Sequence, residues 1–529
     1  MFLPYEISKR EVITIENMEN LKTAIIDIGS NTIRLVLYKY NNLEGLREFG
    51  NIKTVARLRK YLQANGEMSE EGIVLLADTL SSFKKIIDDY DVTDIKATAT
   101  AAIRQATNNQ TIIDRMEKET GILIDLLTEE EEAFFGFVAV AHSMDTKSAV
   151  TIDIGGGSTE ITLFEDKKLQ KTISFPFGTV SLKEMFVSGE AISKEEKEPL
   201  RQYVRQQFEK LEWIKQIGLP VIGIGGSARN AAQIHQQLIE YPISGVHQYE
   251  ITREELTNLS SYLETFSFEQ LKQLDGLSSD RADIIGIALE VFRELMVMVE
   301  AKTFQISKKG LREGLIYNQV LQNNNRAFDK YNVFEGYARR ITFEYGRSED
   351  ERIFLRAITE QFYRECCRLN VCNYNEEQLK LLKRAAQVFA IGEYIEQDSS
   401  NRHTFYLLAN QSIAGMNHVD RVKLALVASY KNKDYFRRFA APFITWIPRD
   451  ELKMLRDFGA MLKFIYALNV SKRNIVESVE FEEIDDVVQI NVKAQHIPMA
   501  EIYQCERQKK HIERIVKKPV QIHFYKKGD

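Results

Sequence analysis

The stretch IIDIGSNTIRLVL, Ile25–Leu37, decides the fold, because the chain repeats its pattern as TIDIGGGSTEITLF, Thr151–Phe164. In each copy an apolar run ends on an acid, a turn of glycine and small polar residues follows, and a β-rich run leads away, which predicts strand, tight turn and strand. The acid is Asp27 in the first copy and Asp153 in the second. One copy alone would indicate an ordinary hairpin. Two acid-led copies predict a duplicated fold with a phosphate held between its halves.

The two turns have the composition of an anion-binding backbone. Glycine lets the chain adopt positive φ and lets its backbone come close to a ligand. Successive N–H groups in such a turn form a concavity that binds anions, and neighbouring hydroxyls add donors. The residues expected to bind phosphate in this way are Ser30, Asn31, Thr32, Gly156, Gly157, Ser158 and Thr159.

Composition limits the class of protein. The 529 residues are enough for several domains, and an apolar content of 44% is ordinary for a globular core. The net charge of −6 does not indicate a general polyanion-binding surface, so we expect no nucleic-acid partner. No apolar run of about 18 residues is present, so no membrane span is expected. Four cysteines without zinc spacing and an N-terminus without signal-peptide features predict a cytoplasmic protein.

The order of predicted elements divides the chain into domains. Residues 1–20 are an expected extension, and residues 21–143 and 144–322 each read as strands followed by alternating helices and strands. Such alternation predicts mixed sheets covered by helices, here as two related lobes. Residues 330–475 have an almost wholly helical period, and residues 476–529 return to alternation, which predicts a small terminal subdomain with strands.

Four further segments carry polar chemistry. ATAAIRQATN places Arg104 in the first turn of a helix, expected at 101–119, directly after a strand. TEEEEAFFGF places four acids at a helix start, where the helix dipole alone would favour them. GIGGSARNAA is a glycine turn that opens a helix, with Gly225, Gly226 and Ser227, and LREG covers 311–314. Taken singly, Arg104 is also explained as a surface arginine, the acids as a helix cap, and the glycine turn as tight packing.

Taken together and in this order, the segments resemble the exopolyphosphatase / guanosine pentaphosphate phosphatase (Ppx/GppA) family. DIGSNTIRL and DIGGGSTE are similar to its two phosphate loops, ATAAIRQA to its arginine segment, EEEEA to its catalytic acids, and GIGGS and LREG to its later signatures. The resemblance covers roughly residues 22–320. It implies duplicated ribonuclease H-like (actin-like) lobes with a cleft between them, in the superfamily of actin-like ATPases and sugar kinases.

The resemblance also implies roles for individual residues. Glu132 matches the general base and Glu131 the other acid of the pair. Asp153 and Glu160 match positions that hold Mg²⁺, and Glu160 also matches a water-positioning glutamate. Asn31 and Arg104 match phosphate contacts. The phosphate-binding residues expected from the motifs are Asn31, Ser30, Thr32, Arg104, Gly156, Gly157, Ser158, Thr159, Gly225, Gly226 and Ser227.

This set fits the hydrolysis of a phosphoanhydride, which needs charge neutralisation, an in-line water and a group that orients it. The expected reaction is the release of orthophosphate from the ends of inorganic polyphosphate, with Mg²⁺, by a homodimer. Alternatives are the hydrolysis of guanosine pentaphosphate, sensing of guanosine tetra- or pentaphosphate without turnover, and an ATP-dependent kinase of the same superfamily. Sequence alone does not separate the two phosphatase substrates.

The C-terminal half resembles the helical HD-type domain of longer family members. Phe389 and Ala390 stand where that domain has its metal-binding pair, so we expect a degenerate domain without a second metal centre. Basic residues from Arg507 to Lys527 gather near the end of the chain. A solvated face explains them as well as a polyanion-binding surface does.

Overall fold

The computed structural model describes residues 21–42 and 44–526, so the expected extension at 1–20 and the basic residue Lys527 lie outside the described residues. The chain forms two compact units, which are described separately. Unit 1 runs to Glu240 and resumes over Val246–Val333, and unit 2 comprises Tyr241–Gly245 and the chain from Phe334 onward. Among the described residues, no helix has the length and apolar character needed to cross a membrane.

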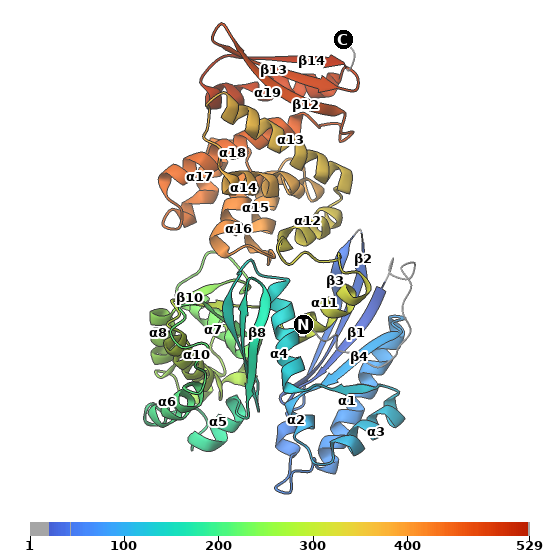
Figure 1. Ribbon diagram of the computed structural model, residues 1–529, viewed down its shortest axis with the longest axis vertical. Coiled ribbons are helices and arrows are strands. Elements are labelled where there is room, and N and C mark those ends of the chain that lie inside the picture. Colours follow the sequence, from blue (N-terminus) through green and yellow to red (C-terminus); the bar gives the residue numbers. More distant parts are fainter. Residues whose placement is uncertain (1–20, 43, 527–529) are drawn as a thin grey trace. The chain divides into compact units, whose positions relative to one another are not determined.

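Unit 1 begins with a sheet that has the order β3-β2-β1-β4-β5 among the described residues (Figure 1). Neighbouring β3, β2 and β1 are antiparallel, whereas β1, β4 and β5 are parallel. The central strand LKTAIIDI is buried along nearly its whole length because helices cover both faces of the sheet. The elements are β1 (Leu21–Ile28), β2 (Thr32–Asn41), β3 (Gly45–Val55), α1 (Glu70–Asp89), β4 (Asp94–Ala99), α2 (Ala101–Arg104), α3 (Asn109–Thr120), β5 (Ile124–Leu126) and α4 (Glu129–Ala141).

The second sheet of unit 1 repeats this topology, with the described order β10-β11-β9-β6-β7-β8. Strands β6, β7 and β8 form the antiparallel meander, and β9 and β11 continue from β6 in parallel. The expected duplication is therefore present. The elements are β6 (Ala149–Ile154), β7 (Thr159–Glu165), β8 (Lys168–Phe175), α5 (Thr179–Phe186), α6 (Lys194–Phe208), β9 (Val221–Ile224), α7 (Gly225–Leu238), β10 (Glu250–Thr252), α8 (Arg253–Leu263), α9 (Phe268–Leu271), α10 (Ile285–Val299), β11 (Thr303–Ile306) and α11 (Leu311–Asn323).

Two helices lie between the sheets, and each packs against the other half of the duplication (Figure 1). Helix α4 follows the first sheet in sequence, yet Phe137 and Val138 share a core with Phe164 of β7. Helix α11 follows the second sheet, yet Ile316 and Val320 pack on the apolar face of β1 and β2. This exchange ties the two lobes together at the base of the cleft and fixes the position of the acids at the start of α4.

The helix expected over 101–119 is wrong as a single element. It breaks into α2 and α3, because the Asn108 side chain bonds the backbone of Met68 twice: its Oδ1 accepts from Met68 N at 3.0 Å and its Nδ2 donates to Met68 O at 3.1 Å. Asparagine side chains compete with helical backbone bonds in this way. The break leaves α2 as a single turn, which directs Arg104 toward α4.

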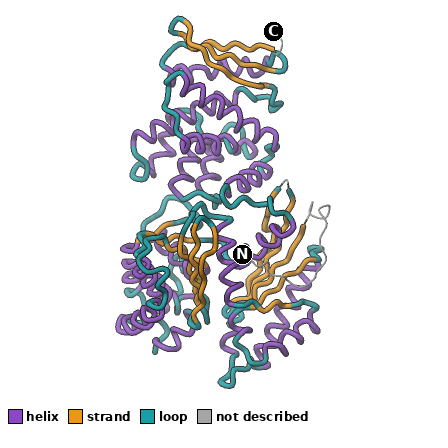
Figure 2. The backbone as a smooth tube through the Cα atoms, viewed as in Figure 1, coloured by secondary structure: helices purple, strands orange, loops and turns teal. Residues whose placement is uncertain are grey.

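Unit 2 is helical first and contains strands at its end, as expected (Figure 2). Its large apolar core runs from Phe334 through the helices to Val520. In the described residues the terminal sheet has the order β12-β13-β14, with α19 between the last two strands. The elements are α12 (Val333–Glu344), α13 (Glu349–Arg368), α14 (Glu376–Gln387), α15 (Ser400–Asn410), α16 (His418–Ala428), α17 (Lys433–Ala440), α18 (Arg449–Ala467), β12 (Val476–Ile484), β13 (Val487–Ala494), α19 (Met499–Val516) and β14 (Val520–Lys526).

Candidate active site

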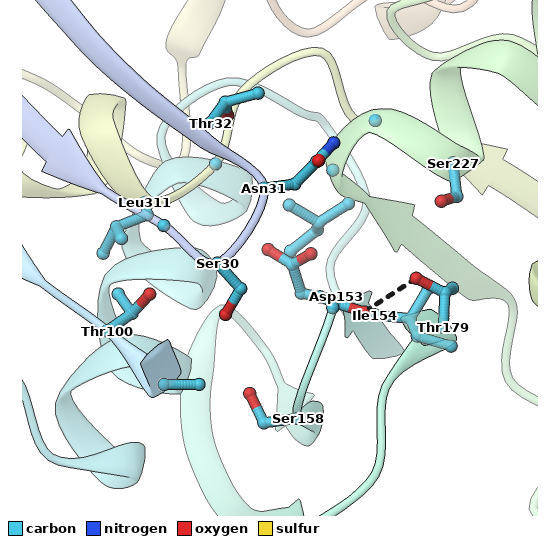
Figure 3. A pocket seen from close by; sticks show the side chains of 18 of the residues that line it. Ser30, Asn31, Thr32, Thr100, Asp153, Ile154, Ser158, Thr179, Ser227 and Leu311 are labelled. Carbon is cyan, nitrogen blue, oxygen red and sulfur yellow. Dashed lines mark hydrogen bonds between the residues drawn. The ribbon is translucent and has the colours of Figure 1, made fainter. Parts of the chain in front are cut away.

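A polar cavity of about 180 Å³ in unit 1 brings the predicted turns together. The same backbone bond closes both turns, because Gly29 N donates to Thr32 O at 3.0 Å and Gly155 N donates to Ser158 O at 2.9 Å. Figure 3 shows the Ser30 and Ser158 side chains facing the same space from the two turns. The predicted residues that line the cavity are Ser30, Asn31, Thr32, Glu132, Asp153, Gly156, Gly157, Ser158, Glu160, Gly225, Gly226 and Ser227.

Glycine is required where these turns approach other groups. A Cβ on Gly157 would lie 2.7 Å from Nη1 of Arg59, and a Cβ on Gly225 would lie 2.6 Å from Oδ1 of Asp153. Gly225 also has φ of +87°, which L-residues with side chains rarely adopt. The glycine turns therefore place backbone directly beside one charged group that lines the cavity, Asp153, and one next to it, Arg59.

Four carboxyl groups line the cavity. Asp27 pairs with Arg312, and the other three stand on different elements. Glu132 stands in the first turn of α4, where its Oε2 accepts from Nη1 of Arg104 at 3.2 Å. Asp153 is in β6, close to its carboxyl end, and Glu160 stands opposite it in the register of β6 and β7. Glu160 accepts from the hydroxyl of Ser174 at 3.0 Å. These elements hold the acids in one region, as a hydrolytic site requires.

Burial shifts the titration of Glu132, Asp153 and Glu160 upward. It raises the pKa of Glu132 to about 7, with Arg104 opposing the shift and Asp153 adding to it. Burial likewise raises the pKa of Asp153 to about 6, against the attraction of Arg229. It also holds the pKa of Glu160 well above its ordinary value, aided by the charges of Glu132 and Asp153. Buried acids of this kind are stabilised by a cation or used as bases near neutral pH.

The donor chemistry fits a hard divalent cation. Mg²⁺ prefers oxygen ligands and is usually held by one or two carboxylates together with water and substrate phosphate. Asp153 and Glu160 offer such carboxylates, each destabilised in its charged form by burial. Within the described residues, no group of three or more histidine, cysteine, aspartate or glutamate side chains has the arrangement of a complete metal centre.

Four arginines line the cavity, and none was among the predicted site residues: Arg34, Arg229, Arg281 and Arg312. Arg312 donates to Oδ2 of Asp27 at 2.7 Å. Burial and the charges of Arg312 and Arg281 lower the pKa of Arg229 to about 10. Burial and the charge of Arg312 also lower the pKa of Arg34. Within the described residues, Arg34 and Arg229 form no ion pair, and guanidinium groups match phosphate oxygens.

Sequence signals existed for some of these arginines. Arg34 stands two residues after Thr32 in β2, so the two-residue period of a strand places both on the same face. Arg229 stands in the first turns of α7, directly after the predicted glycine turn. Arg312 belongs to the quoted LREG segment. Arg281, in a short 3₁₀ turn before α10, has no local signal that points to the cavity.

Three predicted residues do not line the cavity. Arg104 lies behind Glu132, where Nη1 also donates to the carbonyl of Leu127 at 2.8 Å. Glu131 completes the capping box of α4 by accepting from Thr128 N at 2.9 Å, which explains one of the four acids as a helix cap. Thr159 is fully buried and its hydroxyl donates to Phe177 O at 2.7 Å, so this hydroxyl is not free to bind phosphate.

The LREG segment builds the frame of the cavity. Its Glu313 caps α11 by accepting from Gly310 N at 3.0 Å. A Cβ on Gly314 would meet the carbonyl oxygen of Phe135, so only glycine allows α11 to pack this closely on α4. The segment therefore positions the helix that carries Glu132 and the arginine that holds Asp27.

The predicted basic cluster of unit 2 is partly neutralised. Lys509 pairs with Glu506, and Lys518 pairs with Glu483 and Asp486. On the same helix α19, the charges of Lys510 and Arg507 lie near Lys463 of α18 and, after burial, help lower its pKa. Several charges of the predicted cluster are therefore paired with acids within unit 2.

Comparison with known proteins identifies the family. A family model described as the Ppx/GppA phosphatase family matches residues 38–323, and a second, described as Ppx/GppA phosphatase, domain III, matches residues 348–501. The chain is similar to the solved structure of a family member from Aquifex aeolicus, with a TM-score of 0.52 and 27% identity, over 58% of this chain and 99% of that one. These matches confirm the predicted class, a duplicated actin-like α/β fold followed by a further domain.

Relatives of known name differ in the length they share. A bifunctional 3-dehydroquinate synthase/phosphatase from Fusobacterium nucleatum is 27% identical over 55% of this chain, which spans only 46% of that protein. A guanosine-5'-triphosphate,3'-diphosphate pyrophosphatase from Aliivibrio fischeri is 24% identical over 89% of this chain and 91% of its own length. Exopolyphosphatase 1 of Mycobacterium tuberculosis is 24% identical over 57% of this chain and 88% of its own length.

Proposed function

Because the chain belongs to the Ppx/GppA phosphatase family, a family of hydrolases that act on phosphoric anhydrides, we propose that it releases orthophosphate from the ends of inorganic polyphosphate. The charged side chains that line the cavity support this proposal most strongly. Four arginines and four acids line one space beside the two glycine turns. A terminal phosphoryl group supplies negative charge to the arginines and needs a base for its attacking water.

In this mechanism the two turns and the arginines bind the terminal phosphate. Backbone N–H groups near Gly157 and the guanidinium groups of Arg34 and Arg229 stabilise the charge on its oxygens. Glu132 orients a water molecule and accepts its proton as the water oxygen bonds to phosphorus. The bond from phosphorus to the bridging oxygen breaks, and its electron pair leaves with the shortened chain. Arg104 fixes the carboxyl group of Glu132 from behind.

A cation is part of the proposal. Bound Mg²⁺ would neutralise charge on the phosphate oxygens, with Asp153 and Glu160 as the residues that hold it. Glu160 is kept in place by the hydroxyl of Ser174. Both carboxyl groups have a raised pKa because of burial, so they gain more from a neighbouring cation than an exposed acid would.

Hydrolysis of guanosine pentaphosphate is the second candidate. It is favoured by the relative from Aliivibrio fischeri, which matches 89% of this chain, including the C-terminal domain. The chemistry is the same, since both substrates end in a phosphoanhydride. A protein that only senses such nucleotides would not need a base, and the acids around the cavity weigh against that alternative.

The test is phosphate release by the purified protein from long polyphosphate and from guanosine pentaphosphate, at equal concentrations of terminal phosphate with Mg²⁺. We expect faster release from polyphosphate. Faster release from the nucleotide would transfer the assignment to the second candidate, and binding without release would favour the sensing alternative. A cytoplasmic homodimer is part of the same proposal, to be checked by fractionation and by the mass of the protein in solution.

A further inference from the structure

One arginine outside the cavity lining joins the two glycine turns. Arg59 stands in the short 3₁₀ turn Leu58–Tyr61 that follows β3 in the first lobe. Its backbone N–H donates to the carbonyl of Ser30 at 3.3 Å, and the N–H of Arg57 donates to the carbonyl of Asn31 at 2.9 Å. The segment is therefore fixed to the first phosphate turn through its backbone, and Arg59 moves with that turn.

The side chain of Arg59 reaches the second lobe. Its Nη1 lies so close to Gly157 that a Cβ there would be 2.7 Å away, and the same nitrogen donates to Oε1 of Gln105 at 3.0 Å. Its Nη2 lies 3.6 Å from Oε2 of Glu184 on α5. Since Gly157 lines the cavity, a guanidinium group that spans the two lobes sits at the edge of the phosphate-binding backbone.

The pair between Arg59 and Glu184 is weaker than a neighbouring link between the lobes. Lys53 of β3 donates to Asp280 at 3.0 Å, and the side chain of Asp280 is only 14% exposed. Glu184 is 62% exposed, and its separation from Arg59 is longer than a hydrogen bond. Exposed pairs of this kind contribute little. Arg59 can therefore change partners at small cost, whereas Lys53 acts as a fixed tie.

We propose that Arg59 is a positioning residue for the polyanionic substrate, which exchanges Glu184 for a phosphate oxygen when a phosphate occupies the turn at Gly157. The proposal rests on the proposed function of the same cavity. In the free protein Glu184 competes for the guanidinium group and weakens binding. In the bound protein Arg59 links the phosphate to both turns, because its backbone holds Ser30 and its side chain lies on Gly157.

The experiment measures binding of tripolyphosphate to the full chain by calorimetry, with Mg²⁺ present and turnover followed in parallel. Arg59→Gln should weaken binding about tenfold or more, as expected for loss of a charged hydrogen bond. Glu184→Gln should tighten it about twofold to fivefold, by removing an exposed competing partner. Arg59→Lys should recover part of the loss. Lys60→Gln removes the same charge from the exposed neighbouring residue and should change binding by less than about twofold.

The double variant Arg59→Gln with Glu184→Gln separates a specific role from general charge. It should bind like Arg59→Gln alone, because Glu184 acts only through Arg59. Unchanged or weaker binding in Glu184→Gln, or equal losses in Arg59→Gln and Lys60→Gln, would overturn the proposal. Wild-type protein that binds tripolyphosphate without releasing phosphate would contradict the proposed hydrolysis and leave the binding test of Arg59 decisive. Wild-type protein that does not bind it would contradict both.

Discussion

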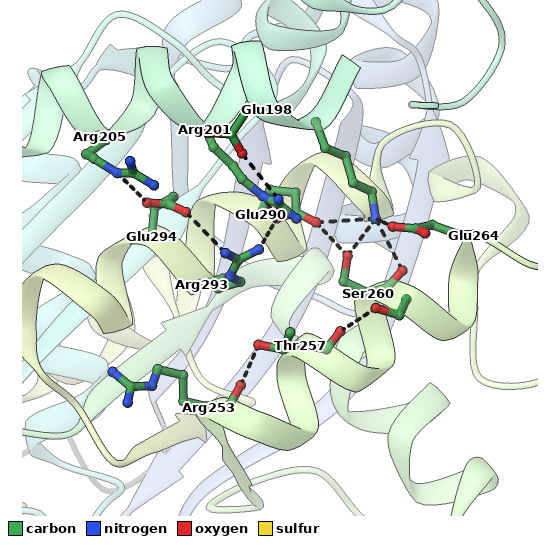
Figure 4. A network of polar contacts seen from close by, with 12 residues as sticks. Glu198, Arg201, Arg205, Arg253, Thr257, Ser260, Glu264, Glu290, Arg293 and Glu294 are labelled. Atoms are coloured by element: carbon green, nitrogen blue, oxygen red, sulfur yellow. Dashed lines mark hydrogen bonds and ion pairs between the residues drawn. The ribbon is translucent and has the colours of Figure 1, made fainter. Parts of the chain in front are cut away.

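Unit 1 contains two clusters of charged side chains, which differ in how completely their charges are paired. Around Glu290 of α10, the basic and acidic groups of α6, α8 and α10 meet in pairs (Figure 4). Glu290 is fully buried and accepts from Arg201 at 2.7 Å and from Ser260 at 2.5 Å, with Lys197 at 3.3 Å. In the cavity the pairing is incomplete: Arg312 pairs with Asp27, but like charges act on Arg229 and on Glu160. The first cluster is paired within the protein, and the second fits the ligand of the proposed function.

The pKa shifts of the two clusters have opposite directions. Burial acts to raise the pKa of Glu290, but the hydrogen bonds from Arg201 and Ser260 and the charge of Lys197 outweigh it and hold the pKa below its ordinary value. Burial raises the pKa of Glu132 to about 7, and Arg104 does not compensate. A raised pKa means that the ionised acid costs folding energy. The cavity is therefore kept at the expense of stability, which is a common property of active sites.

Removing the proposed base, Glu132, should have the largest effect on turnover. Glu132→Gln keeps the size of the side chain and removes the proton acceptor, which typically costs about 10² to 10⁴ in rate. The measurement is steady-state phosphate release with Mg²⁺. Glu131→Gln is the matched control, because Glu131 caps the helix one residue earlier and should keep near wild-type turnover. Near wild-type turnover in Glu132→Gln, with the fold intact, would end its assignment as the base.

Removing the acid of the paired network should act on stability and not on turnover. Glu290→Gln removes the buried carboxylate shared by Lys197 and Arg201, which keep only Glu264 and Glu198. Breaking a buried pair costs about 3 to 5 kcal/mol. Urea unfolding measures the loss, and turnover of the folded fraction should stay near the wild-type value. Equal stability of this variant and the wild type would show that the network does not hold α6 against α10.

The Mg²⁺ dependence of turnover should be set by the carboxylates of the cavity and not by Glu290. Asp153→Asn removes one carboxylate and should raise the Mg²⁺ concentration needed for half-maximal turnover by at least about tenfold, since even indirect partners of metal ligands cost that much. Chelation of divalent ions should abolish wild-type turnover. A Mg²⁺ titration unchanged by Asp153→Asn would indicate that this aspartate is only structural.

The pH dependence of stability should differ in sign between the clusters. The pKa of Glu132 is raised in the fold, so its favourable contribution is present below about pH 4.5 and is lost as the pH rises through about 7. Glu132→Gln should therefore be more stable than wild type at pH 8 by about 1 to 3 kcal/mol, and near equal to it at pH 4.5. The lowered pKa of Glu290 predicts the reverse for Glu290→Gln, with the deficit shrinking as acid protonates wild-type Glu290. Parallel pH profiles for both variants would contradict the distinction.

Sequence predicted the parts of the site that local pattern encodes. The two turns, Asp153, Glu160 and the glycines of the third turn carry their signal within a few residues, and the structure places them together. Contacts between residues far apart in the sequence could not be predicted from such local patterns. Arg281 reaches the cavity only because the 3₁₀ turn before α10 lies beside Gly226, and a Cβ there would meet its guanidinium group.

The run of four glutamates shows why residue type alone did not predict which one faces the cavity. Glu131 and Glu132 are adjacent, yet one accepts from the backbone of Thr128 and the other faces the cavity, because successive residues of a helix point about 100° apart. The exchange of α4 and α11 between the lobes was equally hidden, since an apolar helix face does not state which sheet it covers. Tertiary packing, which the sequence pattern does not encode, determines both the direction of Glu132 and the sheet that each helix covers.

Arg34 and Arg229 of the cavity form no ion pair within the described residues, and we propose that a polyanionic substrate supplies their counter-charge. The most direct measurement is the unfolding midpoint of wild type and Arg229→Gln, each with and without tripolyphosphate. At a concentration near 100 times its Kd, the ligand should stabilise wild type by about 2.7 kcal/mol. The unliganded variant should be at least as stable as wild type, because burial and like charges lower the pKa of Arg229, and should gain far less from the ligand. Equal gains in both proteins, or none in wild type, would contradict this role of Arg229.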